Sequence, residues 1–174
     1  MADTKERWIQ WVALTTTILA VCAAISSLKG GGYSTRVQLS TTQQTNQWAI
    51  FQAKSIKQHV CEVQRDQLKL EYLKTSDPKV RAFIEDRTKS CETDIARYDA
   101  EKSQIKADAD KLAGQQDDCK RHAGAFGLAV MLLQIAIMLS SVGALIKRKA
   151  MWVIGLGFGL LGLAYMANGF LLWF

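Results

Sequence analysis

The chain has 174 residues and carries 22 Lys and Arg against 16 Asp and Glu, a formal net charge of +6. The two ends of the chain hold few charges and the middle is densely charged, a pattern that excludes a single soluble domain with both kinds of residue interspersed. A single proline predicts long uninterrupted helices and excludes a loop-rich or all-β fold.

The first apolar run covers residues 8–28 and contains no formal charge. At 1.5 Å per residue it is long enough to cross a hydrocarbon core of about 30 Å. Small residues near its end also suit cleavage by a signal peptidase. The run is longer than a typical signal-peptide core, so it predicts a retained transmembrane helix after a short N-terminal segment, residues 1–7.

The charged middle, residues 29–122, is predicted to be a helical hairpin outside the membrane. Three consecutive glycines, Gly30 to Gly32, open it and predict a helix stop. The other strong breaker is Ser76-Asp77-Pro78, which predicts a turn near 75–79. The stretches on either side of that turn form the two arms.

Both arms show apolar positions that alternate by three and four residues, which is the seam of a coiled coil. The predicted seam of the first arm is Ala49, Ala53, Ile56, Val60, Val63, Gln67 and Leu70. The predicted seam of the second arm is Ile84, Thr88, Cys91, Ile95, Tyr98, Lys102, Ile105, Ala109, Leu112, Gln116 and Cys119. Leu70 and Ile84 are equally far from Asp77, so the arms are predicted to pair antiparallel.

This seam is weak, because Thr88, Lys102 and Gln67 occupy positions where leucine is expected. A lone hairpin of this kind buries too little apolar surface to offset the entropy of ordering it. A second set of apolar residues lies off the seam: Trp48, Phe51, Leu68, Tyr72, Leu73 and Phe83. The second face predicts that hairpins from several copies pack together. The alternative is a marginally stable, solvated stalk.

Two further apolar runs, residues 123–146 and 152–174, predict a second and a third transmembrane helix. They are separated by a short basic segment, residues 147–151, and must therefore form an antiparallel transmembrane hairpin. The predicted fold is all-α, with three transmembrane helices and a long antiparallel coiled-coil hairpin.

The positive-inside rule places the basic segment 147–151 and the N-terminus in the cytoplasm. The charged hairpin and the C-terminus then lie on the opposite, periplasmic side. Lys29, Arg36, Lys120 and Arg121 flank the spans on that other side and oppose this assignment. The rule therefore discriminates only modestly between the two orientations.

Small and polar residues inside the apolar runs are the candidates for a role in the membrane. Gly155, Gly159 and Gly162 lie on one side of the last run and predict close helix packing, partly within the chain and partly between copies. Gln134 and Asn168 are polar residues within predicted spans. They are expected to hydrogen-bond between helices or, in an oligomer, to line a narrow pore.

Cys61 and Cys91 lie almost opposite one another across the predicted turn. A disulfide between the arms is geometrically possible if the register slips by about one residue, and it suits an oxidising periplasm. The alternative is a pair of free buried thiols.

No sequence motif indicates catalysis. The chain contains no GxGxxG, GxSxG, HExxH or P-loop pattern. His59, Cys61 and Cys91 match no familiar metal-ligand spacing. The charges of the middle are interspersed rather than gathered into a basic surface, which argues against nucleic-acid binding. We expect no enzyme activity, no catalytic residue, no cofactor and no metal.

The chain resembles, nearly from end to end, a family of small bacterial membrane proteins classed only as a domain of unknown function. The matching stretches are WVALTTTILAVCA (11–23), KGGGYSTR (29–36), QWAIFQAKSIK (47–57), HAGAFGLAV (122–130), QIAI (134–137) and NGF (168–170). The resemblance implies one N-terminal span, a charged helical middle, two C-terminal spans and a location in the bacterial inner membrane. It implies no activity, and the cysteine pair is not part of its pattern.

The partners expected from the sequence are the lipid bilayer, further copies of the chain and an unidentified protein bound through the coiled coil. The expected function is a self-assembling membrane protein with a structural or scaffolding role. The alternative function is an oligomeric pore or small-solute channel.

Overall fold

The computed structural model describes residues 3–173, and these residues form three helices and no strand. Helix α1 runs from Asp3 to Lys74, α2 from Pro78 to Leu145, and α3 from Lys149 to Leu171. The loops between them are residues 75–77 and 146–148. Residues 1 and 2 of the predicted N-terminal segment and residue 174 of the predicted last span lie outside the described residues.

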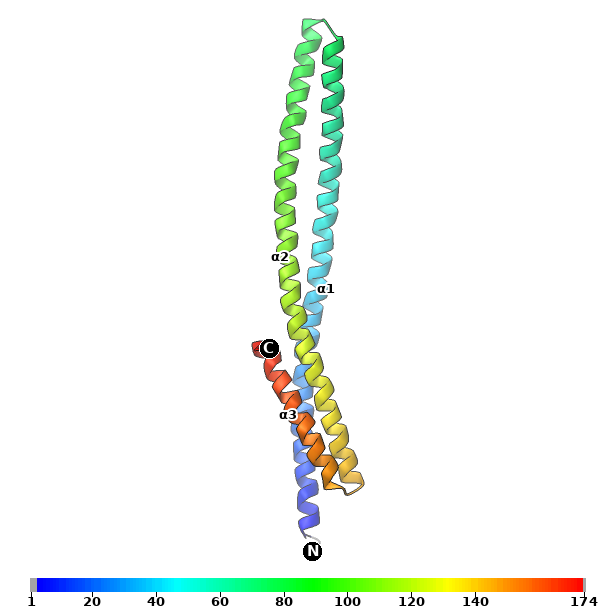
Figure 1. The fold of residues 1–174 in the computed structure, drawn as a ribbon, viewed down its shortest axis with the longest axis vertical. Helices are drawn as coiled ribbons and strands as arrows, with labels where there is room; N and C mark the ends of the chain where they lie inside the picture. Colours follow the sequence, from blue (N-terminus) through cyan, green and yellow to red (C-terminus); the bar gives the residue numbers. More distant parts are fainter. Residues whose placement is uncertain (1–2, 174) are drawn as a thin grey trace. The chain divides into compact units, whose positions relative to one another are not determined.

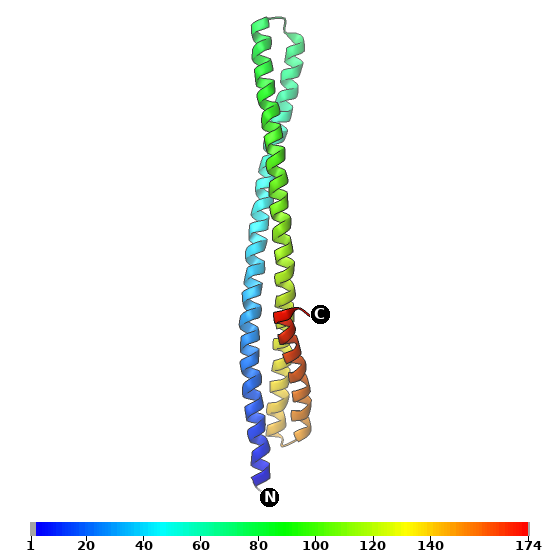
Figure 2. The ribbon, with the colours of Figure 1, turned by 90° about the vertical axis from the view of Figure 1, so that its left-hand side faces the viewer.

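The two long helices pack against each other, and the chain divides into two compact units. The first unit, here called the bundle, comprises the described residues up to Leu39 and those from Gln115 onward. Within it, α3 lies beside the N-terminal part of α1 and the C-terminal part of α2 (Figures 1 and 2). The second unit, here called the hairpin, comprises Ser40–Gly114 and contains the remainder of α1 and α2.

Each of the three helices contains a stretch long and apolar enough to cross a membrane, by length and composition. Large apolar side chains such as Trp11, Ile18 and Leu160 are exposed on the bundle surface. Exposed apolar side chains of this kind suit helices that are surrounded by lipid.

The predicted helix stop at Gly30–Gly32 is wrong, because α1 continues through all three glycines. No described glycine has a positive φ, so none of the three leaves the right-handed helical region. A glycine inside a helix costs only about 1 kcal/mol relative to alanine. Packing of α1 offsets this cost at Gly30, where an added Cβ would lie 3.0 Å from Cβ of Phe126.

The side of α3 that faces the other helices is made almost entirely of glycine. Its buried residues are Gly155, Gly159, Gly162, Asn168 and Gly169. An added Cβ at Gly155 would lie 2.9 Å from the carbonyl oxygen of Ala136, and one at Gly159 would lie 3.1 Å from Leu19. These small residues let α3 approach α1 and α2 closely.

The turn between α2 and α3 uses the left-handed conformation at Lys147, whose φ is 56°. The N–H of Arg148 donates to the carbonyl of Gly143 at 2.9 Å, and that of Lys147 donates to Ala144 at 3.3 Å. This pair of bonds is a Schellman motif, which satisfies the last carbonyls of a helix. The motif allows α3 to fold back on α2 after only three residues.

In the hairpin, the predicted seam of α2 is confirmed. Ile84, Cys91 and Ala109 are buried there. The intervening positions Thr88, Ile95, Tyr98, Lys102 and Ile105 are half-buried. The alternation by three and four residues therefore identified the side of α2 that faces α1.

The predicted seam of α1 is wrong, because every one of its residues is exposed. Ile56 is 65% exposed and Val60 is 58% exposed. We call this set the outer stripe: Ala49, Ala53, Ile56, Val60, Val63, Gln67 and Leu70. The side of α1 turned toward α2, here called the inner face, is Gln47, Phe51, Lys54, Gln58, Cys61, Arg65, Leu68 and Tyr72.

Contacts to the polar residues of α2 favour this choice of face. Lys102 lies in the seam of α2 and has a long ion pair of 3.9 Å with Asp99 of its own helix, so an aliphatic residue opposite would give its charge no contact from α1. The inner face of α1 supplies partners instead: Lys102 Nζ lies 5.5 Å from the centre of the Phe51 ring. Three positions of the second apolar face expected from the sequence, Phe51, Leu68 and Tyr72, thus lie inside the hairpin.

Candidate functional site

In the bundle, an aromatic cluster joins all three helices. The ring of Tyr33 on α1 stacks on His122 of α2, with centroids 4.5 Å apart and planes at 10°. Phe126, one turn further along α2, meets Phe170 of α3 edge to face at 5.0 Å. Aromatic pairs in these geometries contribute about 0.5–1.5 kcal/mol beyond the area they bury. The cluster is therefore a tertiary contact that holds the three helices together.

His122 also supplies a hydrogen bond to the end of α3. Its Nδ1 lies 2.7 Å from the carbonyl oxygen of Gly169. A carbonyl only accepts, so Nδ1 must carry the proton. The last four carbonyls of a helix have no partner inside that helix. His122 therefore completes the C-terminus of α3, where Leu172 in the left-handed conformation already donates to Asn168 at 2.7 Å.

Two glycines make room for the central ring of the cluster. Phe126 is fully buried. An added Cβ at Gly169 would lie 2.9 Å from that ring, and Gly30 approaches it from α1. The cluster thus depends on close backbone approach from two sides.

A groove of about 270 Å³ runs along α1 beside the cluster and is lined by Leu28, Lys29, Gly32, Tyr33 and Arg36. Lys29 Nζ lies 6.0 Å from the centre of the Phe170 ring, and Arg36 Cζ lies 5.6 Å from that of Tyr33. Among the described residues, neither cation has an ion pair with a carboxylate. The groove is therefore cationic and aromatic, and all five of its lining residues belong to α1.

The opposite end of the bundle holds a second group of aromatic residues. Trp8 and Trp152 have ring centroids 6.5 Å apart. The indole N–H of Trp152 donates to the hydroxyl of Thr15 at 3.2 Å, and Lys149 lies over Trp8 at 6.0 Å. Indole and phenol rings at both ends of an apolar bundle are typical of the two membrane–water interfaces.

The two polar residues singled out inside the spans lie in different surroundings. Asn168 is only 4% exposed, within the packed side of α3. Gln134 is exposed on α2, and its side chain has no hydrogen bond to another described residue. Two serines, Ser26 and Ser140, are fully buried, and neither hydroxyl has a partner in the described part of the chain.

Gly155, Gly159 and Gly162 all contact the other helices of the same chain. Gly155 faces Ser140 and Ala136, while an added Cβ at Gly162 would lie 2.8 Å from Cγ of Leu133. The glycine side of α3 is thus occupied within one chain.

Polar contacts connect the two arms of the hairpin. Lys54 forms an ion pair with Glu101 at 2.6 Å, and the hydrogen bond from Lys54 lowers the pKa of the Glu101 carboxyl. Tyr72 donates to Glu85 at 2.9 Å, which raises the pKa of the Tyr72 phenol.

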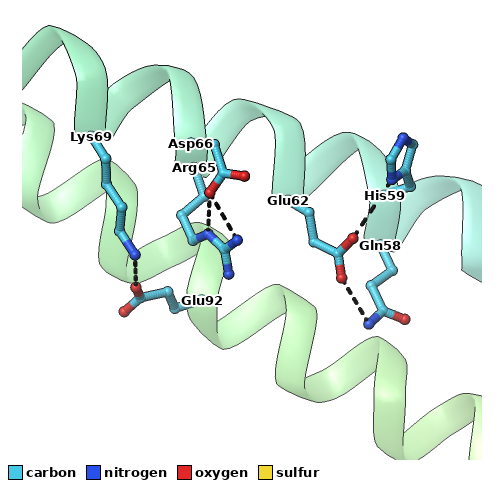
Figure 3. A network of polar contacts seen from close by, with 7 residues as sticks. All are labelled: Gln58, His59, Glu62, Arg65, Asp66, Lys69 and Glu92. Carbon is cyan, nitrogen blue, oxygen red and sulfur yellow. Dashed lines mark hydrogen bonds and ion pairs between the residues drawn. The ribbon is translucent and has the colours of Figure 1, made fainter.

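Lys69 bridges to Glu92 at 3.1 Å between the arms, whereas the nearby pair of Arg65 and Asp66 lies within α1 (Figure 3). Because Lys69 and Glu92 are both about half exposed, their bridge contributes little to stability.

Cys61 and Cys91 are free thiols in the hairpin. Burial raises the pKa of the Cys61 thiol, and the neighbouring Cys91 raises it further. The disulfide between them stays a prediction.

No group of three or more His, Cys, Asp and Glu side chains within residues 3–173 is arranged to hold a metal ion. An open groove of about 670 Å³ lies between the arms of the hairpin and is lined in part by Tyr72, Ile84 and Glu85.

The fold is thus that of an all-helical protein with three membrane-length apolar stretches and a charged two-helix hairpin. The chain belongs to the family described as a domain of unknown function, DUF4337, whose model matches residues 8–172. No curated protein and no solved structure matches the chain.

The aromatic cluster was not predicted from the sequence. Its members come from positions 33, 122, 126 and 170, and no spacing rule connects them. One signal was present, because KGGGYSTR, HAGAFGLAV and NGF are among the stretches that carry the family resemblance. The structure brings these three stretches together at Tyr33, His122 and Gly169.

Proposed function

We propose that the protein is an integral membrane protein that associates with further copies of itself and has a structural or interaction role. The outer stripe of α1 carries the proposal. Its aliphatic members alternate by three and four residues, the spacing of a helix that meets another helix. In the single chain this side meets nothing, and Val63 and Leu70 are 43% and 59% exposed.

A second copy of the chain is the partner that suits this stripe. Copies inserted in one bilayer with the same orientation present α1 in the same direction, so a parallel pair places Ile56 beside Ile56 of the second copy. Such a contact is self-complementary, as symmetric oligomers require. Gln67 is the single polar residue among the last five positions of the stripe, and one polar position within an apolar seam favours a defined register.

Gln134 supports the same proposal from the bundle. An amide exposed to lipid has no water to hydrogen-bond, and polar residues in spans therefore face other helices. The exposed Gln134 has no partner among the described residues of its own chain. A second copy would provide one.

Cysteine cross-linking tests the outer stripe directly. In a cysteine-free background reconstituted in lipid, we expect Ile56→Cys to form a disulfide-linked dimer on mild oxidation. The matched control is Gln104→Cys, which is also exposed but lies on the other arm. Equal cross-linking of both variants, or of neither, would contradict the proposed interface.

A second experiment measures the assembly itself. Replacing Ile56 and Val60 by glutamine removes two exposed aliphatic side chains, each worth on the order of 1 kcal/mol at an interface. We expect the wild-type chain to be a defined oligomer by light scattering in detergent and in nanodiscs, and the double variant to shift toward monomer. A wild-type monomer in both media would overturn self-association.

An oligomeric pore is the alternative function, and the exposed Gln134 also favours it. In a ring of copies this amide would line a polar path through otherwise apolar spans. The pore predicts conductance in planar bilayers that Gln134→Leu abolishes. Oligomers that conduct nothing would contradict the pore and support the structural role.

We further propose that the protein lies in a bacterial inner membrane with residues 1–7 and the loop around Arg148 in the cytoplasm. The basic residues of that loop support this orientation. The hairpin and the C-terminus would then be periplasmic. A single cysteine at Ser76 should react with an impermeant maleimide in intact cells; reaction only after lysis would reverse the orientation.

The proposal assigns no catalysis to the chain. An unidentified protein bound through the hairpin remains compatible with the outer stripe, and the cross-linking pattern separates the two occupants. When the Ile56→Cys cross-linking is repeated in native membranes, a product whose mass is not a multiple of the chain mass would identify a different protein as the partner and contradict the contact between copies.

A further inference from the structure

We propose that the cationic groove on α1 binds the phosphate-bearing headgroup of an anionic lipid. The inference rests on the proposed membrane insertion of residues 8–28. Lys29 follows that apolar run directly, so Lys29, Tyr33 and Arg36 would lie at the depth of the headgroups. Tyr33 lies between the two cations on the same side of the helix, one turn from each.

The spacing of the two cations suits a headgroup. Lys29 and Arg36 are seven residues apart, hence two helical turns or about 10 Å. Both are exposed and neither pairs with a carboxylate among the described residues. Arginine and lysine both bind phosphate oxygens through charge-assisted hydrogen bonds.

Gly32 provides the space between them. It lines the groove, and an added Cβ there would meet nothing within 4 Å. Helix packing therefore does not require this glycine, although glycine weakens the helix. A headgroup lying between Lys29 and Arg36 would occupy the space that a side chain at position 32 would fill, which gives a reason for glycine there.

The aromatic cluster holds the groove in place. Tyr33 is stacked on His122 and on Phe126, the latter with centroids 6.0 Å apart. Its ring therefore forms a fixed wall, and Arg36 lies over it at 5.6 Å. No hydrogen bond joins the Tyr33 hydroxyl to another side chain or carbonyl in the described part of the chain, so the hydroxyl is available to a phosphate oxygen.

Native mass spectrometry of the full chain in detergent tests the proposal with phosphatidylglycerol and phosphatidylcholine as probes. We expect the wild type to retain phosphatidylglycerol preferentially. The double variant Lys29→Gln, Arg36→Gln should lose this preference, with roughly a fivefold weaker affinity for each cation removed. The matched control, Lys106→Gln with Lys111→Gln, removes two exposed lysines of the hairpin and should keep the preference.

A second pair of variants tests the groove without changing charge. Gly32→Leu should fill the groove and weaken phosphatidylglycerol retention, whereas Gly31→Leu, which does not line the groove, should not. Equal retention by wild type and by both groove variants would overturn the proposal. Release of the lipid by millimolar inorganic phosphate would also overturn it, because the groove would then bind a soluble anion rather than a lipid.

The same mass spectra report the mass of the assembly, so they test the lipid site and self-association independently of each other. A monomer that retains phosphatidylglycerol selectively would contradict self-association and support the lipid site. An oligomer that retains both lipids equally would contradict the lipid site alone. Extraction of the wild type from membranes by alkaline washing would contradict the membrane insertion on which the lipid site rests.

Discussion

His122 of α2 donates from Nδ1 to the carbonyl oxygen of Gly169 on α3 at 2.7 Å, while its ring stacks on Tyr33 of α1. One imidazole thus contacts the backbone of one helix and the side chain of another. The contact satisfies a carbonyl that α3, which ends at Leu171, leaves without a partner of its own.

Replacing His122 by phenylalanine should separate the contribution of the hydrogen bond to Gly169 from that of the ring stacking on Tyr33. Phenylalanine keeps a ring for Tyr33 but removes the donor, so the Gly169 carbonyl loses its partner at a cost of about 1–3 kcal/mol. We expect a lower thermal unfolding temperature in detergent, followed by circular dichroism. His59→Phe is the control, since the side chain of His59 is 76% exposed. Equal unfolding temperatures for the two variants would show that the hydrogen bond contributes nothing.

The packing of α3 predicts opposite effects for two neighbouring glycines. An added methyl at Gly155 meets Ser140 Oγ at 2.7 Å and the Ala136 carbonyl at 2.9 Å. Gly155→Ala should therefore separate α2 and α3 and cost about 1–3 kcal/mol. Gly157 has nothing within 4 Å, so Gly157→Ala should be neutral or stabilising by up to about 1 kcal/mol. Thermal unfolding of both variants in the same detergent measures whether each substitution lowers or raises the stability.

Acid should weaken the hairpin through Glu101. The hydrogen bond from Lys54 lowers the pKa of this carboxyl in the folded chain. Its stabilisation is therefore complete above the ordinary glutamate pKa of about 4.3 and disappears as the pH falls through the lowered value. When the pH is lowered below about 4.3, the unfolding temperature of Glu101→Gln should therefore fall less than that of the wild type.

The control for the acid experiment is Glu71→Gln, since Glu71 is exposed and forms no ion pair with another described residue. This variant should retain the wild-type response to acid. An identical response in Glu101→Gln and wild type would contradict the role given to the Lys54 pair.

Mild oxidation should link Cys61 to Cys91. Both thiols lie in the hairpin, on opposite arms, and burial followed by the neighbouring Cys91 raises the pKa of Cys61. Because the thiolate is the reactive species, linkage should become faster as the pH rises toward that raised pKa. Non-reducing peptide mapping measures the linked fraction, and Cys91→Ser should remove it. Complete alkylation of both thiols after oxidation would contradict the prediction.

The side of α2 that faces α1 was predictable, whereas the side of α1 that faces α2 was not. Ile84, Cys91 and Ala109 are buried as their spacing predicts. Ile56 and Val60 show the same spacing but are exposed. Periodicity identifies which residues share a side of a helix and does not reveal what that side contacts. The inner face of α1 combines apolar residues such as Phe51 and Leu68 with polar ones that pair with charges of α2, as Lys54 does with Glu101.

The sequence by itself determined the three apolar runs, the long helices and the sharp turn before Pro78, because run length and helix breakers act locally. It also identified the glycine side of α3. Only the tertiary structure decided that α1 continues through Gly30–Gly32 and that Tyr33, His122 and Gly169 meet. Those outcomes depend on the free energy of contacts between residues far apart in the chain, which no local propensity contains.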